Sequence, residues 1–192
     1  VRGLVERDVL YLLEPEYVPS PELFLAWYPG GTLDWYTDVA GGKMLFSFEV
    51  SKEEVNESQG AIFRLFDAGD TQGQFALAER RADSFGGHWD ELGATAGQRG
   101  EWTAQVYAPA SGTYVWSLRS TGTAALMLDD KPIALPDGGE MREARALSKG
   151  WHALRLAADA VAGGEVQVEW TPPNGESGRL PREALTTRAP LT

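Results

Sequence analysis

The chain reads Glu101-Trp102-Thr103-Ala104-Gln105-Val106-Tyr107-Ala108-Pro109-Ala110-Ser111-Gly112-Thr113-Tyr114-Val115-Trp116 near its middle, and this stretch decides the fold class. Apolar and polar side chains alternate on both sides of the turn at residues 109–112, which is typical of two strands that each bury one face. Tyr114, Trp116 and Leu118 share a face of the second strand. We therefore predict that they belong to a hydrophobic core and do not form a binding surface.

Short strands of the same kind recur through the rest of the chain. They are predicted at residues 62–66, 101–107, 113–119, 125–128, 151–157 and 165–170, between clusters of Gly, Pro, Ser and Asp. Strands that follow one another about every ten residues, without helices between them, indicate an antiparallel sandwich or barrel. We therefore predict a mainly β chain with an antiparallel β-sandwich over residues 59–192.

Residues 1–58 have a different pattern and predict a small α/β unit in the order β-α-β-β. Its helix is expected to begin at Ser20-Pro21-Glu22, because a hydroxyl, a proline and an acid suit the first turn of a helix. Its strands are expected at residues 8–13, 32–38 and 43–50, with Met44, Phe46, Phe48 and Val50 on one face of the last strand. Because a unit this small rarely holds a core alone, we expect it to pack against the sandwich.

A short helix is predicted between the two parts. Ser51-Lys52-Glu53-Glu54 fits a capping box, in which a hydroxyl and an acid three residues later satisfy the first backbone N–H groups of a helix. We expect a helical turn over residues 51–58.

The composition excludes several classes of function. The 28 acidic residues outnumber the 17 Lys and Arg, for a net charge of −11, which argues against nucleic acid and anionic membrane surfaces as partners. The chain has no Cys, so disulfides, thiolate metal sites and cysteine nucleophiles are excluded. The nucleophile elbow, the P-loop, the His-Glu-x-x-His zinc motif and the dinucleotide-binding fingerprint are all absent from the sequence. No catalytic residue is therefore predicted.

The sequence from Gly60 to Leu185 resembles the PA-fourteen domain, the protective-antigen-type β-sandwich of adhesins, glycosidases, glycosyltransferases and toxins. Four pieces carry the resemblance in the family's order: Glu101 to Trp116, Ala125-Leu126-Met127-Leu128-Asp129-Asp130-Lys131-Pro132-Ile133, Leu147-Ser148-Lys149-Gly150-Trp151-His152-Ala153-Leu154-Arg155-Leu156, and Val168-Glu169-Trp170-Thr171-Pro172-Pro173 with Leu180-Pro181-Arg182-Glu183-Ala184-Leu185. The resemblance implies a sandwich fold and a carbohydrate-binding or accessory role.

The resemblance also implies where calcium would bind. In the family's fungal adhesins, two adjacent aspartates just after the strand that matches residues 113–118 coordinate calcium, and the metal binds sugar hydroxyls. Thr121 and Gly122 stand at these two positions. A hard cation needs carboxylates to compete with water, so we expect no calcium, no other metal and no cofactor.

One glycine-rich stretch is the candidate ligand site. Gly86 and Gly87 precede His88, Trp89, Asp90 and Glu91, which together could form a sugar platform from an aromatic face and flanking polar groups. The alternative is an ordinary loop whose Trp89 packs back on the sandwich. No other stretch is expected to bind a ligand. Asp129-Asp130 is interpreted as turn chemistry and His152 as a satisfied, partly buried histidine, and residues 67–73 lack EF-hand spacing.

The chain begins at Val1, without an initiator methionine or a leader, so we expect it to be part of a longer polypeptide. Residues 8–50 resemble the soluble tail of bacterial multi-span membrane glycosyltransferases, through Tyr11-Leu12-Leu13-Glu14-Pro15 and Trp27-Tyr28-Pro29-Gly30-Gly31-Thr32. The favoured hypothesis is a non-catalytic accessory or carbohydrate-binding domain, on the extracytoplasmic side of such a membrane protein, with a glycan and the membrane part as partners. The alternatives are a secreted, calcium-independent lectin and, least favoured, a glycoside hydrolase hidden among the acids.

Overall fold

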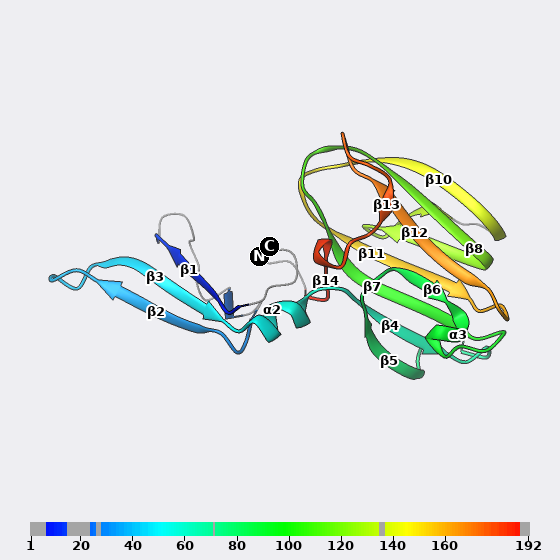
Figure 1. Ribbon diagram of the computed structural model, residues 1–192, viewed down its shortest axis with the longest axis horizontal. Coiled ribbons are helices and arrows are strands. Elements are labelled where there is room, and N and C mark those ends of the chain that lie inside the picture. The colour runs from blue at the N-terminus through cyan, green and yellow to red at the C-terminus, as the bar shows by residue number, and fades with distance from the viewer. Residues whose placement is uncertain (1–6, 15–23, 26–27, 71, 135–136, 189–192) are drawn as a thin grey trace. The chain divides into compact units, whose positions relative to one another are not determined.

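The computed structural model describes residues 7–14, 24–25, 28–70, 72–134 and 137–188. These residues divide into two compact units, one that extends to Gln59 and includes Arg188, and one that comprises Gly60–Thr187 (Figure 1). Within the described ranges, none of the helices combines the length and the apolar character that a membrane span needs.

The first unit is a three-stranded antiparallel sheet in the order β1-β3-β2. The strands are β1 (Val9–Leu13), β2 (Thr32–Thr37) and β3 (Lys43–Val50). Phe24 and Leu25 are helical, and the Tyr28 backbone N–H donates to the Phe24 carbonyl at 2.8 Å. The expected start of this helix, at Ser20, Pro21 and Glu22, lies outside the described residues.

The core of the first unit forms on one face of the sheet. Its buried residues are Tyr28, Phe46, Phe48, Val50 and Val55. Met44, predicted on the same face, is exposed instead. The register between β2 and β3 shifts at this point, from Tyr36 opposite Leu45 to Thr37 opposite Lys43. A bulge of this kind leaves Met44 unpaired and breaks the alternation that the prediction assumed.

Helix α2 (Lys52–Ser58) begins at the predicted Ser51 cap, whereas the Glu54 carboxylate, predicted to complete the capping box, hydrogen-bonds Gly30 instead. The Ser51 hydroxyl accepts a hydrogen bond from the Glu54 backbone N–H at 3.2 Å, which confirms the predicted cap. The Glu54 carboxylate accepts from the Gly30 backbone N–H at 3.0 Å and lies 3.5 Å from the Arg188 guanidinium. Glu54 thereby connects helix α2 to the loop before β2 and to Arg188, the residue that follows the sandwich.

The second unit is an antiparallel β-sandwich. Its elements are β4 (Ala61–Phe66), β5 (Ala76–Ala82), β6 (Gly86–His88), α3 (Trp89–Leu92), β7 (Arg99–Ala108), β8 (Gly112–Leu128), β9 (Lys131–Ala134), β10 (Asp137–Leu147), β11 (Gly150–Asp159), β12 (Glu165–Thr171), β13 (Gly178–Arg179), the 3₁₀ turn Arg182–Ala184 and β14 (Leu185–Thr186). One sheet contains β10, β8, β12, β13 and β6, and the other contains β9, β8, β11, β7, β4 and β5, with β14 also paired to β7.

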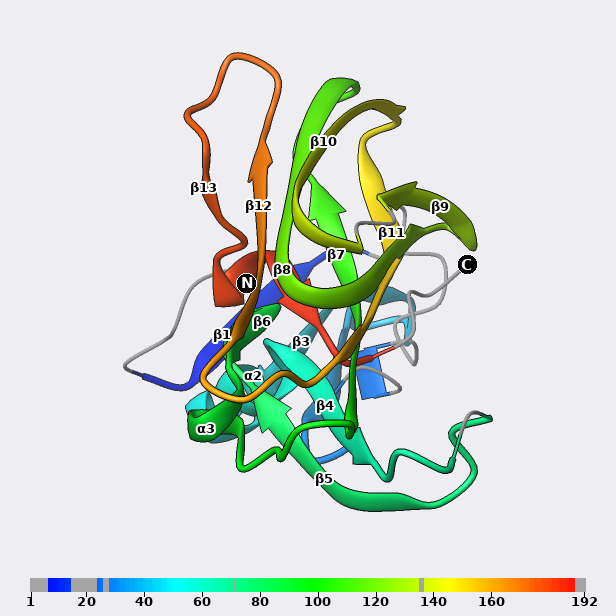
Figure 2. The same ribbon diagram turned by 90° about the vertical axis from the view of Figure 1, so that its right-hand side faces the viewer.

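Strand β8 belongs to both sheets, and Figure 2 shows it as a long, curved strand. Residues 112–123 pair with β10, and residues 124–128 pair with β11. The sequence predicted two separate strands here, at residues 113–119 and 125–128. The backbone instead stays extended through the small polar residues between them, so one strand turns the corner between the layers.

Strands β5 and β10 were not predicted. Nearly all their residues are exposed, since β5 pairs only with β4 and β10 pairs mainly with β8. Edge strands are often polar, which removes the apolar alternation on which the prediction relied.

The sandwich core is rich in aromatic side chains, as predicted for the strand around Tyr114. Trp102, Tyr114 and Trp116 are fully buried. The Tyr114 hydroxyl donates to the Ala110 carbonyl at 2.8 Å, so its polar atom is satisfied within the turn between β7 and β8. The ring of Tyr114 stacks on that of Trp170, with centroids 5.4 Å apart. These contacts confirm the aromatic strand as core.

Candidate functional site

A cleft of about 260 Å³ lies where β6 and α3 meet β12 and β13. Polar side chains from β5, from the β6–α3 segment, from β12 and from β13 line it. They include Arg80, His88, Glu91, Glu165, Gln167 and Arg179. Two of the four predicted ligand-binding residues, His88 and Glu91, are among them. The cleft therefore collects groups from segments that are far apart in the sequence.

Backbone geometry explains the glycines that form one wall of the cleft. Strand β6 pairs with the start of β12, with Gly86 opposite Gln167 and His88 opposite Glu165. Gly86 has φ +107°, and a Cβ atom there would lie 2.2 Å from the Val166 carbonyl oxygen. Only glycine allows the two strands to approach this closely. The pairing brings His88 and Glu165 to the same edge of the cleft.

His88 and Glu165 form an exposed pair. The Nε2 atom of His88 lies 3.5 Å from a carboxylate oxygen of Glu165, and the two side chains are 57% and 28% exposed. The imidazole carries a charge only when it is protonated, and at this exposure an ion pair contributes little to stability. Both groups therefore remain accessible to a ligand.

Trp89 does not form the predicted sugar platform. Its side chain is 1% exposed and packs against Trp102, with ring centroids 5.8 Å apart. Its backbone N–H donates to the Gly164 carbonyl at 3.0 Å. A buried indole offers no face for stacking on a sugar ring, so this part of the prediction is corrected. The alternative, in which Trp89 packs back on the sandwich, is confirmed.

Asp90 and Glu91 lie in the single turn of α3, and both are exposed. Glu91 lines the cleft, whereas Asp90 does not belong to its lining. The helix ends at Gly93, which adopts the left-handed conformation with φ +71° and donates its N–H back into the turn.

Three arginines, Arg80, Arg81 and Arg179, line the cleft, and none of them was predicted as a site residue. The guanidinium of Arg80 lies 5.3 Å from the centre of the Phe63 ring, and its Nη2 atom donates to the Glu91 carbonyl at 3.4 Å. Arg179 donates from Nη2 to the Gln167 amide oxygen at 3.3 Å. The signals that could have drawn attention to them are the Glu79-Arg80-Arg81 run and the lone Arg179 in a polar turn. Nothing in the sequence indicates that they share a site.

Thr121 and Gly122, at the positions of the family's paired aspartates, lie where β8 crosses between the sheets. The Thr121 hydroxyl donates to the Glu165 carbonyl and accepts from the Glu165 backbone N–H, both at 3.1 Å. A Cβ atom on Gly122 would lie 2.8 Å from the Asp159 carbonyl oxygen. The hydroxyl is thus engaged with the backbone of β12 and anchors Glu165 beside the cleft.

Asp129 and His152 form a second pair, in which the imidazole is buried and the carboxylate is about half exposed. The Nδ1 atom of His152 lies 2.7 Å from Asp129, and its Nε2 atom lies 2.9 Å from the Ser148 carbonyl oxygen. The other carboxylate oxygen of Asp129 accepts from the Ala153 backbone N–H at 2.9 Å. His152 is therefore satisfied, as predicted. Asp129 was expected to bond its own turn, but it braces the neighbouring strand β11 instead.

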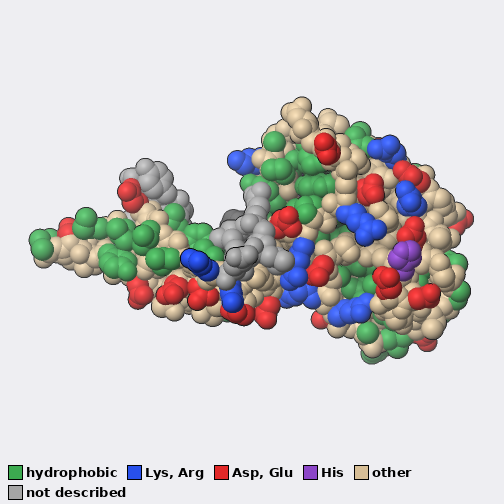
Figure 3. Space-filling view, viewed as in Figure 1, with side chains coloured by type: hydrophobic (Ala, Val, Ile, Leu, Met, Phe, Trp, Pro, Cys, Tyr) green, Lys and Arg blue, Asp and Glu red, His purple; other side chains and the backbone are tan. Residues whose placement is uncertain are grey.

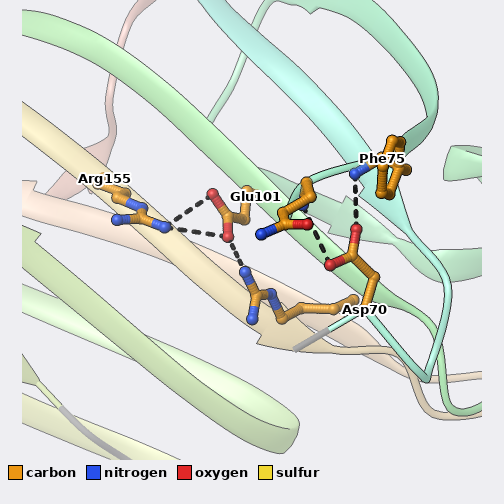
Figure 4. A network of polar contacts seen from close by, with 6 residues as sticks. Asp70, Phe75, Glu101 and Arg155 are labelled. Carbon is orange, nitrogen blue, oxygen red and sulfur yellow. Dashed lines mark hydrogen bonds and ion pairs between the residues drawn. The ribbon is translucent and has the colours of Figure 1, made fainter. Parts of the chain in front are cut away.

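The loop at residues 67–73 uses its central acid for backbone contacts. Figure 4 shows the Asp70 carboxylate directed at the Phe75 backbone N–H, which donates to it at 2.7 Å, and Gln74 donates at 3.0 Å. Hydrogen bonds from Phe75 and then Gln74 hold the pKa of the Asp70 carboxyl below its usual range, because they stabilise the charged form. In the same view, the Nη2 atom of Arg155 donates to both carboxylate oxygens of the buried Glu101, each at 3.0 Å.

The charges of the second unit are mixed over its surface. On the face that Figure 3 presents, Lys and Arg side chains alternate with Asp and Glu. Among the described ranges, His, Asp and Glu side chains do not come together in a group of three that could hold a metal ion. The site therefore consists of hydrogen-bonding groups of both signs around a small cleft.

Three solved structures have a fold similar to that of this chain. The PA14 domain of the MpAFP antifreeze protein matches over 66% of this chain and 89% of its own, with 13% identity and a TM-score of 0.50. The epithelial adhesin 9 A domain of Candida glabrata, in complex with Galβ1-3GlcNAc, matches over 66% and 88%, with 8% identity and a TM-score of 0.51. An anti-sigma factor domain-containing protein from Clostridium clariflavum matches over 98% and 82%, with 14% identity and a TM-score of 0.59.

The second unit therefore has the PA-fourteen type of fold, as the sequence resemblance implied. The chain also matches a β-glucosidase from Kluyveromyces marxianus, in complex with glucose, with 14% identity and a TM-score of 0.52, but it spans only 18% of that chain. No protein-family model matches the sequence, and no curated protein matches it either.

Proposed function

We propose that the second unit is a non-catalytic, saccharide-binding domain and that the cleft beside β6, α3 and β12 is its site. The observation that carries this proposal is the lining of the cleft, where carboxylate, amide, guanidinium and imidazole groups from five elements converge. Such groups match the alternating donors and acceptors of sugar hydroxyls. The adhesin domain of similar fold, which is in complex with a disaccharide, supports the same class of ligand.

The individual groups have complementary roles. Glu91 and Glu165 would accept hydrogen bonds from hydroxyls, whereas Arg80 and Arg179 would donate to them. Gln167 offers a donor and an acceptor in one amide. Because this set needs no bridging cation, and because Thr121 and Gly122 replace the family's acids, binding is expected to be independent of calcium.

Binding of a saccharide panel, measured by calorimetry in calcium and again in EDTA, tests the proposal. Glu165→Gln should weaken binding, since it removes a charged acceptor from the cleft. Glu79→Gln is the matched control, because Glu79 lies outside the cleft and pairs with Arg64 at 2.6 Å. Equal affinity with and without calcium, lost only in the cleft variant, is the expected result. Binding that needs calcium, or that survives Glu165→Gln, would overturn the site assignment.

The same samples test whether the domain is free of catalysis. Incubation with the bound saccharides should leave their reducing ends unchanged, whereas release of new reducing ends would favour the glycoside hydrolase alternative.

We further propose that the domain works on the extracytoplasmic side of a larger, membrane-bound glycosyltransferase-like protein. Cell fractionation with an antibody against this chain should detect a membrane-bound band well above 20.9 kDa. A secreted band near that mass would instead favour the free-standing lectin.

A further inference from the structure

We propose that the cleft binds an acidic saccharide, whose carboxylate is held by Arg80 and Arg179. This inference rests on the proposed function and specifies its ligand class. A carboxylate accepts two parallel hydrogen bonds from a guanidinium, which makes arginine well suited to recognise a sugar acid.

Acidic side chains of the protein do not neutralise these two arginines. Six described arginines of the second unit form ion pairs with acids: Arg64, Arg99, Arg119, Arg145, Arg155 and Arg182. Among the residues that the structure describes, neither Arg80 nor Arg179 has an acid within 4.0 Å. Two arginines without an acidic partner thus lie at one cleft of a chain with net charge −11, and their charges are available to an external anion.

Both guanidinium groups make contacts with neutral groups of the protein. Arg80 lies over the Phe63 ring and uses one N–H for the Glu91 carbonyl. Arg179 uses one N–H for the Gln167 amide oxygen. A guanidinium carries five N–H donors, so each arginine keeps most of them for a ligand. Because these contacts restrict the side chains, less conformational entropy is lost when the ligand binds.

The acids of the same cleft are outnumbered by its arginines. Three acids line the cleft, and one of them, Asp83, pairs with Arg182 at 2.8 Å, which leaves Glu91 and Glu165. Three arginines, Arg80, Arg81 and Arg179, line the same cleft. The local charge therefore favours an anion although the whole chain is acidic.

The size of the cleft limits the ligand to a small unit. Its volume of about 260 Å³ is just below the range of roughly 300–1,000 Å³ that is typical of pockets for drug-sized molecules. One sugar residue of a longer chain fits this volume better than an oligosaccharide does. A uronic acid or a terminal sialic acid has the required carboxylate.

The test compares acidic oligosaccharides with neutral ones of the same length. The probes are tri-galacturonate, tri-glucuronate, tri-mannuronate and a sialyl-lactose, each with its neutral counterpart, and affinity is measured by calorimetry at low salt and at 0.15 M salt. At least one acidic probe should bind at least tenfold more tightly than its counterpart, and added salt should weaken it.

Arg80→Gln and Arg179→Gln should each reduce that affinity at least tenfold, whereas Arg142→Gln, on the exposed strand β10, should not change it. Arg179→Lys separates charge from geometry, because it keeps the cation and loses the fork. A partial loss in Arg179→Lys and a full loss in Arg179→Gln support the inference. The free energy of unfolding of each variant, measured in urea, identifies any loss that comes from misfolding.

The outcomes separate the inference from the proposed function. If neutral saccharides bind as well as acidic ones, the inference is wrong and the saccharide site stands. If no acidic probe binds, the inference is also wrong, and neutral probes then decide the proposed function. If neither class binds, both are wrong.

Discussion

The two histidines of this chain each lie beside a carboxylate, but their surroundings differ. His88 is 3.5 Å from Glu165, and its side chain is 57% exposed at the edge of the cleft. His152 is 2.7 Å from Asp129, and its side chain is 10% exposed, with its second nitrogen against a backbone carbonyl. The buried histidine has both ring nitrogens satisfied by the protein, whereas the exposed one keeps room for a ligand.

The difference shows why residue type alone does not identify a site. The Asp129–His152 pair joins the turn after β8 to strand β11, through the imidazole and through the Ala153 N–H. The His88–Glu165 pair joins two strands that the backbone already pairs. Removal of the first pair should therefore affect stability, and removal of the second should affect binding.

The largest expected effect comes from the residue next to the exposed histidine. Trp89→Ala should reduce the free energy of unfolding by about 3–5 kcal/mol, because it leaves a large cavity against Trp102. Asp90→Ala, one position further along, should stay within about 0.5 kcal/mol. Urea denaturation measures both. Loss of saccharide binding in Trp89→Ala without any loss of stability would restore the tryptophan as a platform.

The direct test of the comparison exchanges each histidine for alanine. His152→Ala should cost about 1–3 kcal/mol of stability, because it removes a buried imidazole that hydrogen-bonds the charged Asp129 and the Ser148 carbonyl. His88→Ala should change stability by less than about 0.5 kcal/mol. Chemical denaturation of the two variants provides the measurement, and equal losses would contradict the assignment of one pair to the scaffold and the other to the cleft.

A smaller effect is expected at Thr121, through which strand β8 anchors Glu165 of the exposed His88–Glu165 pair. Thr121→Val removes the hydroxyl that both donates to and accepts from the Glu165 backbone, and should cost about 1 kcal/mol. Because Glu165 lines the cleft, saccharide affinity should fall as well. Thr123→Val, whose hydroxyl contacts Asp137 and does not touch β12, is the control. Unchanged affinity in Thr121→Val would show that Glu165 does not depend on this anchor.

The smallest effect is expected for Asp70, a carboxylate that does not pair with a histidine. Asp70 is partly exposed, and the backbone hydrogen bonds from Phe75 and Gln74 lower its pKa. The unfolded chain therefore binds this proton more readily, so the contribution of Asp70 is present above an ordinary Asp pKa of about 3.9 and disappears as the pH falls through the lower, folded value.

Amide hydrogen exchange tests this prediction. Protection of the Phe75 and Gln74 amides should persist through the ordinary Asp pKa of about 3.9 in the native protein and weaken only at lower pH, and Asp70→Ala should show weak protection at every pH. Protection that does not change with pH in the native protein would contradict the role of the carboxylate.

The sequence was most informative where a local rule applied. The cap of α2 follows from Ser51 and Glu54 alone, and the aromatic strand follows from alternation over residues 113–119. Prediction failed where a long-range partner decided the outcome. Nothing local marks the bulge at Met44, the continuity of β8 or the polar edge strand β10, because each depends on register with another strand.

The residues of the candidate site also differ in whether the sequence alone could indicate them. The glycines and His88 were recognisable because a close backbone approach requires glycine in any context. Arg80 and Arg179 were not, since their pairing at one cleft depends on how β5 and β13 are arranged. Trp89 was misjudged because an indole near polar groups has the same sequence pattern whether it faces solvent or the core.

By itself the sequence determined the fold class, the cap of α2 and the aromatic character of the core, since these depend on the periodicity and chemistry of neighbouring residues. Only the tertiary structure decided which histidine is scaffold, which arginines lack an acidic partner and where the cleft lies. Burial and charge pairing are properties of side chains brought together from distant segments, and no short stretch of sequence encodes them.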